Sequence, residues 1–189
     1  MRTEIRFAGF GGQGIILASI ILGRAVVVYE KNYAFQTQSI GPEARGGVSR
    51  SEVVISTDNP RDYPKVRNLD ILITMNNDSL NTYVKDLSKG KTLLYDPDMV
   101  VELPNLDGIN SYPIPFTKTA HELGNKIVAN VIMLGSLVAI TNVVSKESVK
   151  KAVCDAVPEK FKELNLTALE KGFELGELAK NNNNNNINS

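Results

Sequence analysis

The segment between residues 5 and 18 constrains the fold more than any other part of the chain. An apolar stretch, residues 5–8, is typical of a buried strand, and an apolar helix is predicted to begin at Ile15. Between them lie glycines at G-x-G-x-x-G spacing with one more inside the motif: Gly9, Gly11, Gly12 and Gly14. This order places bare backbone N–H groups at a helix N-terminus, where they favour an anion such as a phosphate.

Two interpretations of this turn remain open, a phosphate-binding or anion-binding site and a glycine-rich turn that serves packing alone. A standard dinucleotide site also requires an acidic residue about 20 residues further along, at the end of the second strand. The next extended segment, residues 33–39, ends in amides and hydroxyls, and Glu30 lies too early, at the end of the predicted helix 15–29. The sequence therefore argues against a standard NAD site.

Length and composition fit one domain with an adequate core. The chain has 189 residues, 42% of them hydrophobic, and a net charge of zero, so nothing indicates a nucleic-acid or membrane partner. Polar residues interrupt the longest apolar stretch, residues 127–144, which favours a buried or interface helix over a membrane span. The N-terminus runs directly into a strand, so no signal peptide is expected and we expect a cytoplasmic protein.

Residues that usually carry catalysis or metals are scarce in this sequence. The one cysteine, Cys154, lies at helical spacing from apolar neighbours, which favours a core thiol over a nucleophile. The one histidine, His121, has no partner pattern around it, which favours a surface or capping role. Iron–sulfur clusters need about four cysteine ligands, so the chain cannot hold one alone. By itself the chain lacks catalytic equipment.

The remaining pattern alternates strands with helices, which predicts an α/β domain with a largely parallel sheet. The expected strands are residues 5–8, 33–39, 49–56, 69–75, 91–95 and 111–116, the last a proline-bearing edge segment. The expected helices are residues 15–29, 80–87, 117–123, 127–142, 146–157 and 166–179. We expect a single domain over residues 1–180, followed by a disordered asparagine-rich tail over residues 181–189.

Several motifs together resemble the gamma subunit of 2-oxoacid:ferredoxin oxidoreductases. They are G-F-G-G-Q-G at 9–14, Q-T-Q-S-I-G-P-E-A-R-G-G at 36–47, S-R-S-E-V-V-I-S at 49–56, L-G-N-K at 123–126 and N-V-I-M-L-G at 130–135. The form with Q-T-Q-S ahead of G-P-E is most similar to the 2-oxoglutarate branch of the family. The resemblance covers essentially the whole chain apart from the asparagine tail.

The resemblance implies a three-layer Rossmann-like fold with a mostly parallel sheet, similar to domain III of pyruvate:ferredoxin oxidoreductase. It also implies a cytoplasmic heterotetramer that converts 2-oxoglutarate and coenzyme A to succinyl-CoA and CO₂ and reduces ferredoxin. Thiamine diphosphate, Mg²⁺ and iron–sulfur clusters are then expected in the alpha, beta and delta subunits. The gamma chain is expected to hold no cofactor or metal alone, to have no catalytic residue, and to contact coenzyme A.

The candidate cofactor-binding residues lie in two loops that we expect to meet at the carboxyl edge of the sheet. They are Gly9, Gly11, Gly12, Gln13 and Gly14 in the first loop, and Gln38, Ser39, Glu43, Arg45, Gly46 and Gly47 in the second. Arg45 could grip a phosphate of coenzyme A, or it could pair with Glu43 or a neighbouring subunit. Two other functions also remain open at this point, a stand-alone nucleotide-binding oxidoreductase and a purely structural scaffold subunit.

Overall fold

A computed structural model of the chain describes residues 1–39, 48–58 and 63–187. Its six-stranded sheet has the order β2-β3-β1-β4-β5-β6. The strands are β1 (Arg2–Phe10), β2 (Tyr33–Ser39), β3 (Val48–Ser56), β4 (Leu69–Thr74), β5 (Leu87–Tyr95) and β6 (Asn110–Pro113). The pairs β1–β4, β4–β5 and β5–β6 are parallel, whereas β3 runs antiparallel to both β1 and β2. The sheet is therefore mostly parallel, as the sequence predicts.

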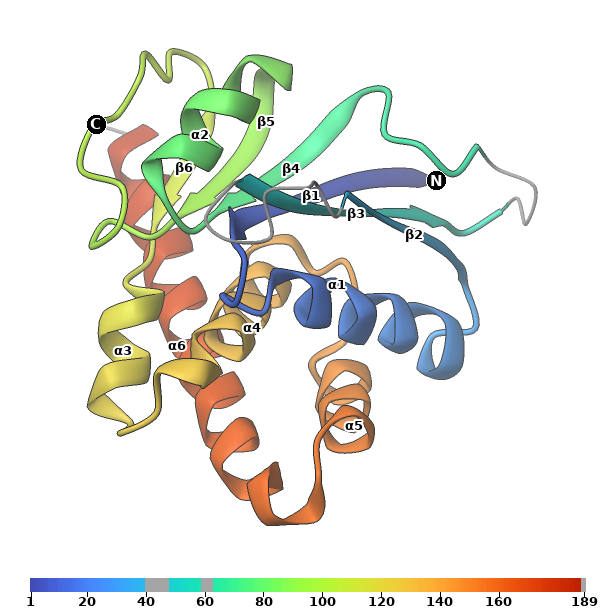
Figure 1. Cartoon of the computed structure of the whole chain (residues 1–189). Coiled ribbons are helices and arrows are strands. Elements are labelled where there is room, and N and C mark those ends of the chain that lie inside the picture. The colour runs from blue at the N-terminus through green and yellow to red at the C-terminus, as the bar shows by residue number, and fades with distance from the viewer. Residues whose placement is uncertain (40–47, 59–62, 188–189) are drawn as a thin grey trace.

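Helices cover both faces of this sheet (Figure 1). Helix α2 (Asn77–Tyr83) packs on one face, over a cluster that includes Leu72 and Leu93. The helices that pack on the other face are α1 (Ile15–Arg24), α3 (Phe116–Glu122), α4 (Ala129–Thr141), α5 (Lys146–Ala156) and α6 (Lys162–Ile187). This arrangement is the three-layer α/β/α architecture expected from the resemblance.

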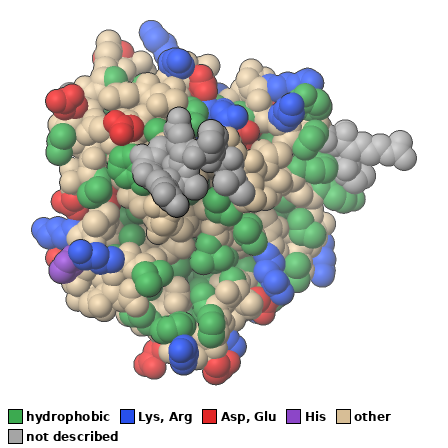
Figure 2. All heavy atoms as spheres, in the orientation of Figure 1, with side chains coloured by type: hydrophobic (Ala, Val, Ile, Leu, Met, Phe, Trp, Pro, Cys, Tyr) green, Lys and Arg blue, Asp and Glu red, His purple; other side chains and the backbone are tan. Residues whose placement is uncertain are grey.

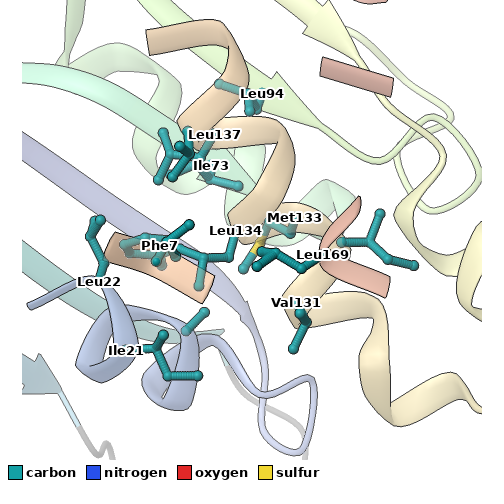
Figure 3. Packing of buried hydrophobic residues seen from close by; sticks show 14 of the residues in the cluster. Phe7, Ile21, Leu22, Ile73, Leu94, Val131, Met133, Leu134, Leu137 and Leu169 are labelled. Atoms are coloured by element: carbon teal, nitrogen blue, oxygen red, sulfur yellow. The ribbon is translucent and has the colours of Figure 1, made fainter. Parts of the chain in front are cut away.

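The larger core lies between α1, α4 and the sheet (Figure 3). Phe7 of β1 lies in this core together with Ile21 and Leu22 of α1, and Leu134 and Leu137 of α4 pack on the same face of the sheet. Every residue of α4 from Ala129 to Ile140 is buried within this chain. The sequence left open whether this apolar helix is buried in the core or lies at a subunit interface. Packing in the core of the same chain is sufficient to explain it.

Helix α4 packs against α6 with unusually close backbones. A Cβ atom added at Gly172 would lie 2.2 Å from the carbonyl oxygen of Ile132, and one at Gly135 would lie 2.5 Å from that of Leu169. The hydroxyl of Ser136 donates a hydrogen bond across the contact to the carbonyl oxygen of Gly172 at 2.9 Å. The glycines therefore allow two helices to meet at a distance that no side chain would permit.

Several predicted boundaries differ from the structure by a few residues. Helix α2 begins at Asn77 rather than at residue 80, because Asn76 is its N-cap and accepts a hydrogen bond from the N–H of Ser79 at 2.8 Å. The predicted helix 15–29 is α1 followed by a π-helical segment, Ala25–Tyr29. The predicted strand 91–95 begins earlier, at Leu87, and pairs with β4 through an irregular register.

The C-terminal helix is longer than the sequence predicts. Helix α6 extends to Ile187, into the asparagine run for which disorder is expected. Nucleation is the unfavourable step in helix formation. Because the preceding turns of α6 are already helical, residues with weak helix propensity, such as asparagine, can continue the helix. The division into a domain of residues 1–180 and a separate tail stays a prediction.

Candidate functional site

The glycine turn lies at the carboxyl edge of the parallel strands, between β1 and α1. Gly12 and Gly14 have φ angles of 92° and 75°, in the left-handed region that favours glycine. Gly14 is the N-cap of α1, and the helix has neither a side-chain cap nor an acidic residue in its first turn. The first N–H groups of a helix have no carbonyl partner inside it, so α1 begins with free donor capacity and a positive dipole end.

A shallow hollow of about 210 Å³ lies over this turn. Its walls are formed by Phe10, Gly11, Gly12, Gly14, Ile15, Ile16 and Ser49. Gly11 and Gly12 are exposed, and a Cβ atom at Gly12 would meet nothing within 4 Å. Among the residues that the structure describes, nothing covers the backbone at these two glycines, which could therefore meet a ligand or a partner.

The other residues of the motif are engaged in building the turn. The side-chain oxygen of Gln13 accepts the N–H of Phe10 at 2.6 Å, and its NH₂ group donates to the carbonyl oxygen of Met75 at 3.2 Å. A Cβ atom at Gly9 would lie 2.6 Å from that same side-chain oxygen. Gln13 thus ties the turn to the end of β4, and Gly9 is needed to make room for it.

Asn130 of α4 fixes the start of α1. Its side-chain NH₂ group donates to the carbonyl oxygen of Gly14 at 3.2 Å, and a Cβ atom at Gly14 would lie 2.5 Å from it. Asn125 caps the next helical turn, because its side-chain oxygen accepts the N–H of Ile127 at 3.0 Å. Both asparagines thus have structural roles in this chain.

The second candidate loop leaves and re-enters the sheet beside the glycine turn. Ser39 at the end of β2 pairs with Arg50 of β3, and Val48 at the start of β3 pairs with Phe10 at the end of β1. Gln38 and Ser39 are exposed at this edge. The remaining candidates, Glu43, Arg45, Gly46 and Gly47, lie outside the described residues.

The structure gives a second reason against a standard NAD site. In that site, the strand after the first helix lies next to β1 and presents its carboxylate to the ribose. Here the antiparallel strand β3 separates β2 from β1. Glu30 is engaged elsewhere, since its carboxylate accepts the N–H of Ser145 at 2.9 Å. Hydrogen bonds from Ser148 and Ser145 hold the pKa of Glu30 below its ordinary value.

A charged cluster on the opposite face of the sheet was missed by the sequence analysis. The buried guanidinium of Arg6 donates to Glu52 at 2.7 Å, also pairs with Asp86, and lies 4.9 Å from the ring centre of Tyr83. The guanidinium of Arg50 lies 5.9 Å from the centre of the same ring. The signal in the sequence was one charged residue within each of two apolar segments, Arg6 in β1 and Glu52 in β3. These two residues have opposite charges and are direct partners in the sheet.

Asp96 is a buried carboxylate at the same carboxyl edge, directly after β5. One oxygen accepts the N–H and the hydroxyl of Thr117, at 2.8 and 2.5 Å, and the other accepts the N–H of Asp98 at 3.0 Å. Burial raises the pKa of Asp96 above its ordinary value, although these hydrogen bonds oppose the shift. Its hydrogen bonds fix the start of α3, which makes Asp96 a structural residue.

Groups for covalent or metal chemistry are scarce in the part of the chain that the structure describes. No three His, Cys, Asp or Glu side chains among these residues are close enough to hold a metal ion. His121 is exposed in the last turn of α3, as expected. Cys154 on α5 is only partly buried, so its predicted place in the core is wrong. Among the helices of residues 1–39, 48–58 and 63–187, none is long and apolar enough to cross a membrane.

Comparisons with known proteins agree with this geometry. The model of the family described as pyruvate ferredoxin/flavodoxin oxidoreductase matches residues 4–175. The chain is 52% identical to 2-oxoglutarate synthase subunit KorC of Methanocaldococcus jannaschii, over 93% of this chain and 94% of that one. It also matches the crystal structure of a keto/oxoacid ferredoxin oxidoreductase gamma subunit from Geobacter sulfurreducens, with 43% identity, a TM-score of 0.84 and coverage of 94% and 99%.

A further match is to a larger protein. The structure of 2-oxoglutarate:ferredoxin oxidoreductase from Magnetococcus marinus, with 2-oxoglutarate, coenzyme A and succinyl-CoA bound, aligns with a TM-score of 0.85 and 25% identity. The alignment covers 94% of this chain but 31% of that one. In that enzyme, the same fold is therefore one segment of a longer polypeptide.

Proposed function

The chain belongs to the pyruvate ferredoxin/flavodoxin oxidoreductase family, and on that premise we propose that it is the gamma subunit of a 2-oxoglutarate:ferredoxin oxidoreductase. The complex converts 2-oxoglutarate and coenzyme A to succinyl-CoA and CO₂ and passes two electrons to ferredoxin. The carbon and redox chemistry belongs to the alpha, beta and delta subunits, which hold thiamine diphosphate, Mg²⁺ and iron–sulfur clusters. The assembled complex works in the cytoplasm.

The contribution of this chain is a surface for the phosphates of coenzyme A. The observation that carries this proposal is the bare, positive-φ backbone of the glycine turn at the uncapped start of α1. A phosphate at that position accepts hydrogen bonds from backbone N–H groups and interacts favourably with the helix dipole. The similarity to the Magnetococcus marinus enzyme, which has coenzyme A bound, supports the choice of ligand.

The second loop is proposed to complete this surface. Its flanking residues Ser39 and Val48 lie at the same sheet edge as the glycine turn. Arg45 is the cation we assign to a phosphate of coenzyme A, because a guanidinium can bind two phosphate oxygens at once. Gly46 and Gly47 are proposed to let the ligand approach the backbone, and Glu43 to orient Arg45.

A matched pair of glycine substitutions tests the coenzyme A surface. Gly12 and Gly90 both have positive φ, 92° and 80°, and at both positions a Cβ atom would meet nothing within 4 Å. Gly12→Ala and Gly90→Ala therefore impose the same kind of backbone strain at two distant places. In the assembled complex we expect Gly12→Ala to raise the KM for coenzyme A about tenfold, and Gly90→Ala to leave it unchanged.

The substitution Arg45→Ala separates ligand binding from assembly. If Arg45 holds a phosphate, the variant assembles normally and its KM for coenzyme A rises. If assembly fails while the KM of the remaining complex stays constant, the loop is an interface instead. Titration of NAD and coenzyme A against the isolated chain excludes or supports the alternative of a stand-alone nucleotide-binding oxidoreductase. A complex in which none of these variants changes the KM supports the scaffold alternative.

A further inference from the structure

A polar groove of about 350 Å³ lies on the side of the sheet where α2 packs. Strands β1, β2 and β3 form its floor, and residues 65–66, which precede β4, form one wall. Figure 2 shows basic and acidic side chains along the upper part of the molecule, where α2 lies in Figure 1. Six residues that line this charged groove carry hydroxyl or ionised groups: Arg6, Thr37, Ser39, Arg50, Glu52 and Lys65.

Strand register brings most of these groups onto one face. Thr37 of β2 pairs with Glu52 of β3, and Glu52 pairs with Arg6 of β1, so these side chains form a row across the sheet. Ser39 and Arg50 pair in the next row. Because residues two apart on a strand point to the same side, both rows face the charged groove.

The acidic group in the charged groove is already paired. Glu52 is buried, and one of its carboxylate oxygens accepts the guanidinium of Arg6 at 2.7 Å. Its other oxygen accepts the hydroxyl of Thr37 at 3.5 Å. The guanidinium of Arg6 also pairs with Asp86, so these three ionised groups together carry one negative charge.

Two cations of the charged groove have no carboxylate partner. In the part of the chain that the structure describes, neither Arg50 nor Lys65 forms an ion pair, and the guanidinium of Arg50 donates no hydrogen bond. Arg50 is partly buried and lies over the ring of Tyr83. A ring contact of this kind uses the flat face of a guanidinium and leaves its in-plane N–H donors available. A partly buried guanidinium with unused donors favours an anionic acceptor.

We propose that Arg50, Lys65 and the hydroxyl of Ser39 bind a phosphate group in the charged groove. A phosphate monoester carries a charge of about −1.5 to −2 at pH 7 and accepts several hydrogen bonds. The guanidinium can contact two of its oxygens at once, and the ammonium adds a second positive charge. The volume of about 350 Å³ lies within the range of small-molecule sites, so it admits a phosphate together with part of the molecule that carries it.

This site goes beyond the proposed function, because it is a second phosphate position on another surface of the chain. The glycine turn lies at the start of α1, whereas the charged groove lies on the face of the sheet where α2 packs. A second phosphate of coenzyme A and a separate phosphorylated ligand are the two sources of such a group. Both present the same chemistry to Arg50 and Lys65.

Titration of the full chain with inorganic phosphate tests the site directly. The backbone N–H resonance of Ser39 and the side-chain Nε–H resonance of Arg50 are followed by NMR, with sodium chloride of equal ionic strength as the reference. We expect phosphate to shift both resonances saturably. Arg50→Gln is expected to weaken binding about tenfold, because it removes a charge and the two-oxygen contact. Lys65→Gln, at an exposed residue, is expected to weaken binding by a smaller factor without affecting the fold.

Arg67 offers a matched control. Its guanidinium also lies over a tyrosine ring, that of Tyr63 at 3.9 Å, but Arg67 does not line the charged groove. Arg67→Gln therefore removes the same charge and the same kind of ring contact at a neighbouring place. We expect its affinity for phosphate to equal that of the unaltered chain. Melting temperatures of the variants show whether each remains folded.

The assembled complex distinguishes the two sources of the phosphate. Coenzyme A and dephospho-coenzyme A differ by the 3′-phosphate alone. If the charged groove holds that phosphate, the ratio of their two KM values falls toward one in Arg50→Gln. If a separate ligand supplies the phosphate, this ratio stays constant, and saturating coenzyme A leaves the phosphate-induced shift at Ser39 in place.

Two results would overturn the phosphate site. One is the absence of any saturable shift at Ser39 and Arg50 beyond that caused by sodium chloride. The other is an equal loss of binding in Arg50→Gln and Arg67→Gln, which would indicate a general effect of charge. The titration does not depend on turnover, so a complex that does not oxidise 2-oxoglutarate refutes the proposed function and leaves the phosphate site in place.

Discussion

At Gly172, where α6 crosses α4, an added Cβ atom would collide with a carbonyl oxygen of the facing helix, whereas at Gly12 it would meet nothing within 4 Å. At the glycines of the α4–α6 contact, the backbone of the facing helix occupies the space where a side chain would lie, so the function of these glycines is packing. Beside the exposed glycines of the β1–α1 turn, none of residues 1–39, 48–58 and 63–187 fills the space. The space around a glycine therefore separates a structural role from a surface offered to a ligand or a partner.

The largest expected effect is at the α4–α6 contact. Gly172→Val places a branched side chain where the backbones of two helices touch, so the helices must separate. Overpacking usually costs about 1–3 kcal/mol, and a backbone collision is expected to cost about 3 kcal/mol or more. Urea unfolding of the isolated chain measures this loss. Stability within about 0.5 kcal/mol of the unaltered chain would mean that the helices are not in contact at this residue.

An intermediate effect is expected at Gly14, where the two roles of glycine overlap. Its φ is 75°, and an added Cβ atom would lie 2.5 Å from the side-chain nitrogen of Asn130. Gly14→Ala is expected to lower the free energy of unfolding by about 2 kcal/mol, from backbone strain and this contact together.

A double-mutant cycle separates the two causes at Gly14. Asn130→Ala removes the colliding nitrogen, so Gly14→Ala should cost about 1 kcal/mol less in that background. Equal costs in both backgrounds would assign the whole effect to the backbone and leave Asn130 without a contact to this position.

A smaller, pH-dependent effect is expected at Asp96, the buried carboxylate at the same sheet edge. Its pKa is raised in the folded state, mainly by burial, so folding favours the protonated form. Its contribution to stability is therefore greatest below the unfolded pKa of about 3.9 and is lost as the pH rises through the raised folded pKa.

The variant Asp96→Asn isolates this contribution. The stability of the unaltered chain minus that of the variant should fall as the pH rises above about 4 and then level off. Unfolding titrations across this range measure it. A difference that rises with pH would mean that the hydrogen bonds from Thr117 and Asp98 outweigh burial.

The smallest effect is expected at Gly23 of α1, where an added side chain should raise the free energy of unfolding instead of lowering it as at Gly172. Gly23→Ala adds a Cβ atom in open space within a helix, so it should raise the free energy of unfolding of the isolated chain by about 0.5–1 kcal/mol. The same substitution at Gly172 should lower it. Destabilisation by Gly23→Ala would show that another part of this chain covers the position.

Much of the fold could be predicted from the sequence, because its signals are local. The strand–glycine–helix order near residue 12 predicts the β1–α1 unit, and the apolar run of β4 predicts a buried strand, each without reference to the rest of the chain. The antiparallel insertion of β3 between β1 and β2 could not be predicted, since it depends on which strands pair and no local pattern encodes that choice. The start of α2 was placed too late because Asn76, Asn77 and Asp78 all favour capping positions.

The position of the candidate site could be predicted from the sequence, but the contacts that each of its residues makes could not. The motif located the turn, yet nothing in the spacing indicated that Gln13 would bond to Phe10 and Met75. The pairing of Arg6 with Glu52 escaped notice because the two residues lie 46 positions apart and meet only through strand register. Long-range pairs of this kind appear only once the topology is known.

Amide hydrogen exchange on the assembled complex, with and without coenzyme A, tests most directly whether the open turn binds this ligand. The account predicts that coenzyme A slows exchange in a peptide spanning residues 11–16, while peptides from the α4–α6 contact are unaffected. Unchanged exchange at residues 11–16 under saturating coenzyme A would contradict it.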